Sequence, residues 1–166
     1  MNTRVEDFIT VTEVDHGPVF VESIFQRRYK QSAPDFPHHI VAFWRRDDGG
    51  FVPLCYAHFS DAGEILLGGG ACTDDRVLRR LSAVQRDALR TVGGVYQHTL
   101  DYAVKHFAPR YAAIFGYCGD GLAERVDLAV GFSKTEYKHL LVYWTRDLAP
   151  AQRAVLLAQA DAVGPF

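Results

Sequence analysis

The chain of 166 residues is 48% hydrophobic and 23% charged, with a formal net charge of -2. This length suits one domain, residues 1–166, that is large enough to bury a core. The small net charge argues against a general nucleic-acid-binding protein, which usually carries a basic face. The three cysteines are spread along the chain and form neither a disulfide framework nor a metal-ligand cluster. We therefore expect a reducing compartment and no metal site.

Targeting and membrane signals are absent from the pattern of the sequence. Residues 1–14 are too polar for a signal peptide. No apolar run approaches the roughly 20 residues that a membrane-spanning helix needs. These features predict a cytoplasmic protein with no membrane partner.

The first half of the chain predicts a strand, a helix and a run of antiparallel strands. Residues 8–14 alternate apolar and polar side chains, which is typical of a strand. Residues 19–30 carry apolar side chains at helical spacing, and Pro34 and Pro37 follow the end of that helix. The strands expected next are residues 39–45, 51–59 and 64–73, which are joined by short turns.

A run of three glycines, Gly68, Gly69 and Gly70, lies inside the last of these strands. Glycine weakens a strand and often marks a bulge or the close approach of a ligand or another backbone. A strand irregularity without functional meaning explains the run equally well.

The second half of the chain predicts helices alternating with strands. Ser82 and Gln85 have the form of a capping box, so we expect a short helix from there to Arg90. The further elements expected are a helix over 94–107, a buried strand over 111–118, a helix over 120–131, a strand over 139–144 and a closing helix over 150–163. The helix over 94–107 permits a parallel pair between the strands that it joins.

Two of these helices carry specific expectations. Leu122, Val126 and Val130 predict the inward face of the helix over 120–131. The closing helix either covers an edge of the sheet or contacts a second subunit, so a homodimer is one expected assembly.

Gly93 and Gly94 precede the helix over 94–107. Without Cβ atoms they let a ligand approach the backbone where the first helical amides are still unpaired. Such amides, at the positive end of the helix dipole, bind phosphate oxygens, and Arg90 upstream adds a charge-assisted contact. A plain break between two helices is the alternative for the same residues.

The run Arg90-Thr91-Val92-Gly93-Gly94-Val95 resembles the Arg/Gln-x-x-Gly-x-Gly/Ala loop of the GCN5-related N-acetyltransferase (GNAT) superfamily, although Val95 departs from that pattern. The spacing of Asp120, Ala123, Asp127, Gly131 and Phe132 is similar to Asn-x-x-Ala-x-x-x-Tyr-x-x-x-Gly-Phe of the same superfamily. The order of elements over residues 39–145 is also similar, with the helix before Arg90 as an insertion. The chain thus resembles a divergent member.

This resemblance implies an α+β fold, with a mixed, mostly antiparallel sheet flanked by helices and, here, an extra C-terminal helix. It implies acetyl-CoA or another acyl-CoA as co-substrate, with the pantetheine arm between the fourth and fifth strands. The cofactor-binding residues that it implies are Cys72, Arg90, Val92, Gly93, Gly94 and Val95. The implied function is acyl transfer to an amine of unknown type. A catalytically degenerate module that binds CoA, another ligand or a protein is the alternative, and an unrelated α+β binding domain is a third.

The candidate proton donors follow from the chemistry of acyl transfer, in which the leaving thiolate needs a proton. Asp127 stands where the superfamily often has a tyrosine in this role, and a carboxyl group suits it only if burial raises its pKa. Tyr137 and Tyr117 have suitable side chains, with a structural role as the alternative for each.

Candidate bases and nucleophiles are chosen by residue type. Glu64 is our first candidate base, and the others are Asp74, His39 and His58. Cys72 and Cys118 lie near the expected ends of the diverging strands. Each is either a nucleophile or a small buried hydrophobe, and the second is the commoner case.

Overall fold

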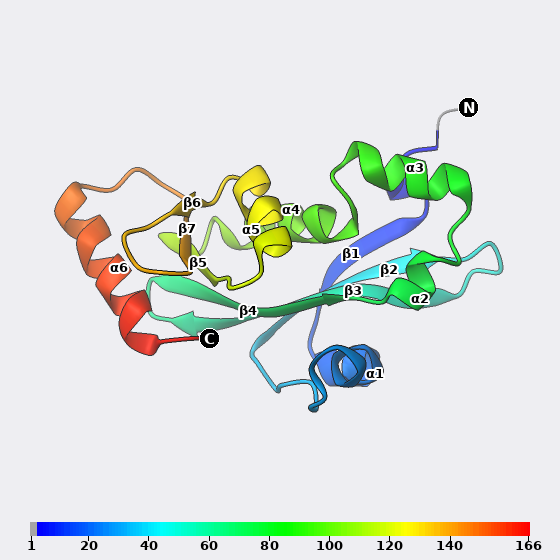
Figure 1. The fold of residues 1–166 in the computed structure, drawn as a ribbon, viewed down its shortest axis with the longest axis horizontal. Coiled ribbons are helices and arrows are strands. Elements are labelled where there is room, and N and C mark those ends of the chain that lie inside the picture. Colours follow the sequence, from blue (N-terminus) through cyan, green and yellow to red (C-terminus); the bar gives the residue numbers. More distant parts are fainter. Residues whose placement is uncertain (1–2) are drawn as a thin grey trace.

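A seven-stranded sheet is the centre of the computed structural model, which describes residues 3–166 (Figure 1). Its strands are β1 (Ile9–Val14), β2 (His38–Arg45), β3 (Phe51–Ala62), β4 (Ile65–Thr73), β5 (Ala113–Tyr117), β6 (Ser133–Lys134) and β7 (Leu140–Trp144). They lie in the order β1-β2-β3-β4-β5-β7-β6, and β4 with β5 is the one parallel pair within residues 3–166. The predicted α+β fold with a mixed, mostly antiparallel sheet is confirmed.

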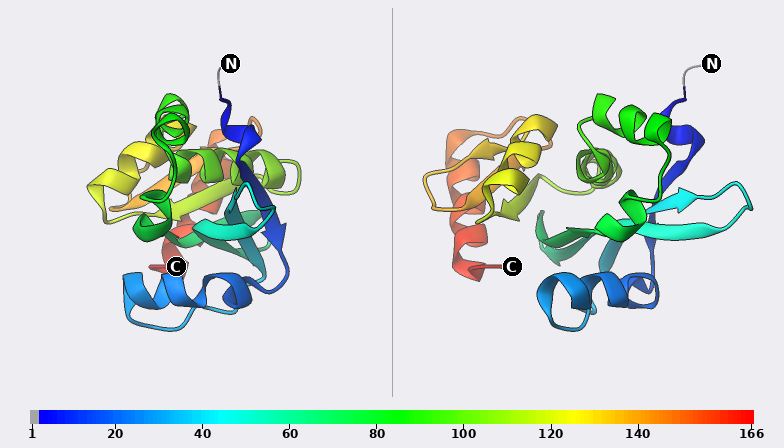
Figure 2. Two further views of the ribbon diagram at one scale, coloured as in Figure 1. Left: turned by 90° about the vertical axis from the view of Figure 1, so that its right-hand side faces the viewer. Right: turned by 45° about the vertical axis from the view of Figure 1, so that its right-hand side comes forward.

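Helices cover both faces of this sheet (Figures 1 and 2). They are α1 (Gly17–Tyr29), α2 (Asp75–Leu78), α3 (Ala83–Thr91), α4 (Val95–Phe107), α5 (Gly121–Val130) and α6 (Pro150–Val163), with a 3-10 turn at Val5–Asp7. In the figures α1 lies on one face, and α3, α4 and α5 lie on the other. No helix within residues 3–166 is both long enough and apolar enough to cross a membrane.

The C-terminal helix α6 packs on a face of the sheet, against β4, β5 and β7, and does not cover a sheet edge as one alternative had it. Its Leu156 and Ala160 are buried in a core cluster with β4 and β5 residues such as Ile65 and Phe115. Leu66, between the β4 residues of that cluster, faces α4 instead. Because side chains alternate along a strand, α6 lies on the face of the sheet opposite to α4.

The parallel strands β4 and β5 diverge at their carboxyl ends. They pair from Ile65 with Ala113 to Gly68 with Gly116. Beyond Gly68, β4 remains paired with β3 as far as Thr73, whereas β5 ends at Tyr117 and leads into α5. The divergence that the sequence resemblance implied is therefore present, and it leaves a gap between main chains at the centre of the sheet.

The structure corrects the predicted inward face of α5. Leu122 is 70% exposed, and the buried residue of this helix is Asp127. An aspartate occupies the inward position because its carboxyl group receives a hydrogen bond from α4, so burial does not leave it unpaired. The prediction based on hydrophobic spacing was wrong at Leu122, and it overlooked the short elements α2 and β6.

Candidate functional site

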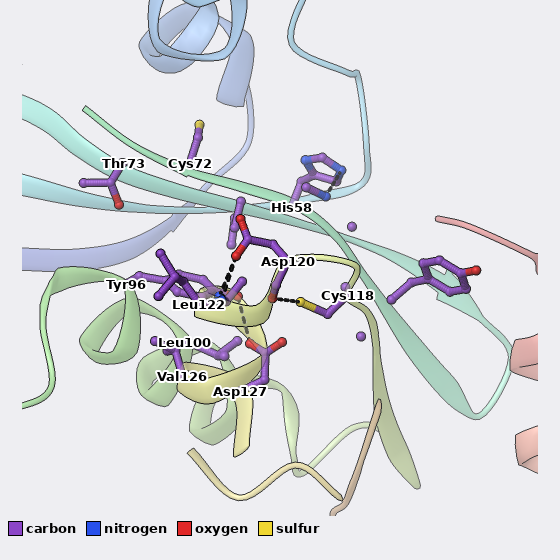
Figure 3. A pocket seen from close by; sticks show the side chains of 18 of the residues that line it. His58, Cys72, Thr73, Tyr96, Leu100, Cys118, Asp120, Leu122, Val126 and Asp127 are labelled. Atoms are coloured by element: carbon purple, nitrogen blue, oxygen red, sulfur yellow. Dashed lines mark hydrogen bonds between the residues drawn. The ribbon is translucent and has the colours of Figure 1, made fainter. Parts of the chain in front are cut away.

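A cavity of about 550 Å³ opens where β4 and β5 diverge (Figure 3). This volume falls in the range of roughly 300–1,000 Å³ that is typical of small-molecule sites. Residues 68–73, which begin with three glycines, form one wall, and residues 115–120 form the other. Side chains on the α1 side are Arg28, Tyr29, His58 and Cys72, and those on the α4 and α5 side include Tyr96, Leu100, Val126 and Asp127. A ligand in this cavity contacts exposed main-chain groups and both faces of the sheet.

The three glycines of β4 form a bulge on the cavity wall. Ala71 pairs with Ala57 and Gly68 pairs with Phe59, so Gly69 and Gly70 together oppose the single residue His58. A Cβ atom on Gly69 would lie 2.3 Å from His58 Nε2, which leaves room for glycine only. The predicted bulge is confirmed, and close approach of an imidazole is its physical reason.

Asp127 of α5 and Tyr96 of α4 form a hydrogen-bonded pair at the cavity. The Tyr96 hydroxyl donates to Asp127 Oδ1 at 2.9 Å, and Asp127 is 6% exposed. Burial raises the pKa of Asp127, and the hydrogen bond from Tyr96 only partly opposes that effect. Burial, followed by the charge of Asp127, raises the pKa of Tyr96. The pair therefore retains protons more strongly than the same groups at a surface.

Tyr96 is the site residue that the sequence pattern did not reveal. Its aromatic ring packs against the main core cluster, as expected of an apolar ring on the inner side of a helix. Its hydroxyl group was the available signal, because a buried tyrosine usually has a hydrogen-bond partner.

The two candidate cysteines at the cavity are protonated thiols at neutral pH. Burial, and next the neighbouring Cys55, raises the pKa of Cys72 to about 12. Burial also raises the pKa of Cys118, whose Sγ donates to the Asp120 carbonyl at 3.2 Å. A thiol is a poor nucleophile in this state, so both cysteines behave as small buried hydrophobes.

The candidate bases lie in different places. Glu64 is exposed in the turn before β4, at the end of the strand away from the cavity. Asp74 caps α2 and is paired with Arg27 of α1, and neither lines the cavity. His39 is fully buried and bonded to the Tyr56 hydroxyl at 2.6 Å. Among these candidates, His58 is the one that lines the cavity.

Tyr137 and Tyr117, the candidate donors, also occupy different positions. Tyr137 lies in the loop between β6 and β7 and packs against the core cluster beneath α6. It does not line the cavity, whereas Tyr117 does. Asp127 is thus the one member of our predicted set Asp127, Tyr137 and Glu64 that the structure places at the cavity.

The predicted phosphate-binding residues connect α3 to α4. Gly93 and Gly94 have φ angles of 80° and 99°, which residues with a side chain rarely adopt. Gly94 begins α4 without any side-chain cap in the described structure, and the space next to it is open. The first amides of α4 therefore remain available to an anion.

The other predicted cofactor-binding residues have mixed positions. Arg90 is exposed and forms an ion pair with Asp87, while Val92 ends α3 and Val95 is buried in the core. None of the residues from Arg90 to Val95 lines the cavity. Tyr96 and Leu100, which follow them in α4, do line it. Cys72 is the predicted cofactor-binding residue that lies on the cavity wall.

Solved acetyltransferase structures share this architecture. The ribosomal-protein-S18-alanine N-acetyltransferase from Escherichia coli aligns with a TM-score of 0.59 at 8% identity, over 86% of this chain and 97% of the other. A putative N-acetyl transferase from E. coli, YhhK, bound to coenzyme A, aligns with a TM-score of 0.55 at 14% identity, over 82% and 98%. The ribosomal-protein-S5-alanine acetyltransferase from Vibrio fischeri aligns with a TM-score of 0.50 at 12% identity, over 86% and 96%.

The chain therefore has the fold of an N-acetyltransferase. The likeness shows the fold alone, because the sequence identity to these structures is between 8% and 14%. No protein-family model matches the sequence, and no curated protein matches it significantly. The resemblance stated from the sequence is confirmed at the level of the fold.

Proposed function

We propose that this protein is an acyl-CoA-dependent N-acyltransferase, which transfers an acetyl group or another acyl group from CoA to an amine. The observation that carries the proposal is the cavity between the diverging strands β4 and β5, with the buried pair Tyr96–Asp127 on one side of it. The likeness of the fold to acetyltransferases, one of them bound to coenzyme A, supports the same assignment.

The acyl-CoA would enter the gap between the two walls of the cavity. Its extended arm suits a gap that is bounded by Gly68–Ala71 and by Gly116–Gly119, because main-chain groups there, other than the Gly70 amide and the Ala71 carbonyl, can pair with the amides of pantetheine. Its phosphates would bind the uncapped first turn of α4 at Gly93 and Gly94, with Arg90 nearby in sequence.

The chemistry requires an amine lone pair to attack the thioester carbonyl carbon. The carbon–sulfur bond then breaks, the acyl group stays on nitrogen, the nitrogen gives up one proton to solvent, and the CoA thiolate takes up a proton. Asp127 is the acid in this proposal, because burial favours its protonated form. Tyr96 fixes the orientation of the carboxyl group through its hydrogen bond.

A CoA-binding module without turnover is the second candidate function. It is favoured by Asp127 itself, which stands where the resemblance to the superfamily leads us to expect a tyrosine. Release of free CoA thiol in the presence of a panel of amines separates the enzyme from such a module.

The first test is a thermal-shift titration with CoA and acetyl-CoA on the wild type and on Gly94→Glu. Gly49→Glu is the matched control, since Gly49 also has a positive φ of 83° and open space beside it, but lies in the β2–β3 turn. We expect both variants to lose stability and only Gly94→Glu to lose the saturable rise in Tm. No rise for the wild type at millimolar ligand would overturn the proposal.

A further inference from the structure

The bulge of β4 is held by a side chain in place of an ordinary strand contact. The Gly70 amide donates to His58 Nε2 at 2.9 Å, across the point where the β3–β4 register shifts. In a regular antiparallel pair, main-chain groups of the two strands bond to each other. Here an imidazole accepts the bond, and Gly69 and Gly70 are drawn around its edge.

The imidazole itself is fixed in position on the α1 side of the sheet. It stacks on Phe36 with ring centroids 4.4 Å apart and an interplanar angle of 7°. Its ring centroid also lies 6.0 Å from that of Phe25 and 5.6 Å from that of Tyr56. His58 is 4% exposed. The bulge therefore rests on a side chain whose own rotation is blocked by three aromatic rings.

A histidine at position 58 leaves one buried ring nitrogen without a hydrogen-bond partner within residues 3–166, so its other ring nitrogen must matter to the bulge. Because Nε2 accepts from Gly70, the ring proton is on Nδ1, and Nδ1 is buried without a partner among the described residues. An unpaired buried donor is unfavourable, and a phenylalanine would fill the same stacked space without one. The acceptor that His58 offers to Gly70 is the property that phenylalanine lacks.

The protonation state of His58 keeps that acceptor available. Burial, and next the nearby His39, lowers the pKa of His58 to about 4. The ring is therefore neutral over the whole neutral range of pH, and Nε2 keeps its lone pair for the Gly70 amide. This engagement also makes His58 unsuitable as the base of the reaction.

The segment that His58 holds is part of the wall of the proposed active site. Gly68, Gly69, Gly70 and Ala71 all line the cavity. Cys118 lines the opposite wall, just after β5 (Figure 3). A shift of this main chain would move whatever groups it presents to the thioester. Misplacement by about 1 Å in an active site can lower a rate roughly 100-fold.

We propose that His58 is a positioning residue for acyl transfer, which locks the Gly69–Gly70 bulge of β4 in the arrangement that receives the thioester. It acts through the Gly70 amide and does not touch the reacting atoms. This proposal rests on the proposed function, since the thioester is the group that the bulge must receive.

The kinetic test compares His58→Phe, which keeps the stacked ring, with His58→Gln, which keeps an acceptor. We expect His58→Phe to lower kcat by roughly 10- to 100-fold while KM for acetyl-CoA and Kd for CoA stay near wild type, and His58→Gln to regain much of the loss. His38→Phe is the matched control, because His38 is a largely buried histidine of β2 that packs against Phe107 and does not line the cavity. It should lower Tm without changing kcat.

The structural test needs no turnover. In uniformly ¹⁵N-labelled protein, a through-hydrogen-bond ¹⁵N–¹⁵N coupling should connect the Gly70 amide to His58 Nε2. Absence of this coupling, or a kcat for His58→Phe equal to wild type, overturns the proposal. If His58→Phe does not fold, kcat and KM are measured for His58→Met instead, since methionine also lacks the ring nitrogen acceptor.

Failure of the proposed function gives a different result. If the wild type binds no CoA and releases none, the acyltransferase assignment fails and the positioning role fails with it. The ¹⁵N–¹⁵N coupling would still be observed in that case. Absence of the hydrogen bond between Gly70 and His58 is therefore distinguishable from failure of the acyltransferase assignment.

Discussion

The Tyr96 hydroxyl donates a hydrogen bond to Oδ1 of the Asp127 carboxyl group at 2.9 Å and thereby joins α4 to α5 beside the cavity. The two residues are 31 positions apart in the chain, and both belong to the cavity lining. The carboxyl group is buried, so its pKa is raised, and the hydroxyl is its partner. Together they form the proton-retaining unit of the site.

We predict that Asp127→Asn lowers kcat by roughly 100-fold, since general acid catalysis commonly contributes about 10²- to 10⁴-fold. Tyr96→Phe should lower kcat less, and the double variant should resemble Asp127→Asn alone because the two groups act as one unit. Tyr102→Phe is the control, since Tyr102 also lies on α4 but does not line the cavity. Fully additive losses would contradict a joint role.

The pH dependence of kcat gives a second prediction for the same pair. An acid must be protonated to act, so kcat should fall as pH rises through the raised pKa of Asp127. Asp127→Asn should remove this limb of the profile. A limb that persists unchanged in Asp127→Asn would assign the proton donor to another group.

Cys72 should be dispensable for the chemistry although it lines the cavity. Its pKa of about 12 leaves almost no thiolate at neutral pH. We expect Cys72→Ala to keep the kcat of the wild type, and intact-mass spectrometry during turnover to show no acyl adduct on the protein. An adduct that maps to Cys72 would show a covalent mechanism instead.

A cluster of ionisable side chains at the other end of the sheet predicts a pH dependence of stability. Glu13 accepts from His38 Nδ1 at 2.7 Å and from His106 Nε2 at 2.6 Å, and Arg110 lies 3.8 Å from it. Burial raises the pKa of Glu13, but the hydrogen bonds from His106 and His38 outweigh it, so the pKa is lowered from its usual 4.5.

A carboxyl group whose pKa is lower in the folded protein stabilises the fold above its unfolded pKa, and this contribution is lost as pH falls. We therefore expect the free energy of unfolding of the wild type to fall as pH is lowered from about 5 to about 3. In Glu13→Gln the fall over the same range should be smaller by about 1 kcal/mol. Urea denaturation at each pH measures it. Glu136→Gln, at an exposed position, should leave the slope unchanged, and an identical slope in Glu13→Gln would contradict the prediction.

The elements of the fold were predictable because each depends on a local pattern. The capping box at Ser82 is present as expected, with Ser82 Oγ and Gln85 bonded reciprocally to backbone amides. The apolar run over 111–118 correctly predicted a buried strand, and its parallel partner followed from the helix between them. Spacing alone was sufficient for these features.

The site was less predictable because it depends on which side chains of different elements meet, whereas sequence spacing shows only which face of an element is buried. Hydrophobic spacing identified the buried side of α4 but not that Tyr96 meets Asp127 of another helix. The glycine run indicated a bulge, while the imidazole that requires it comes from β3. Glu64 and Tyr137 were chosen by residue type, and the tertiary structure places both away from the cavity.

The measurement that tests the central claim most directly is an amide NMR titration of ¹⁵N-labelled protein with CoA. The gap between β4 and β5 should respond, so we predict saturable shifts at Gly68–Ala71 and Gly116–Gly119, together with the first amides of α4 after Gly94. Shifts confined to other surfaces, or none at millimolar CoA, would contradict the assignment of this cavity as an acyl-CoA site.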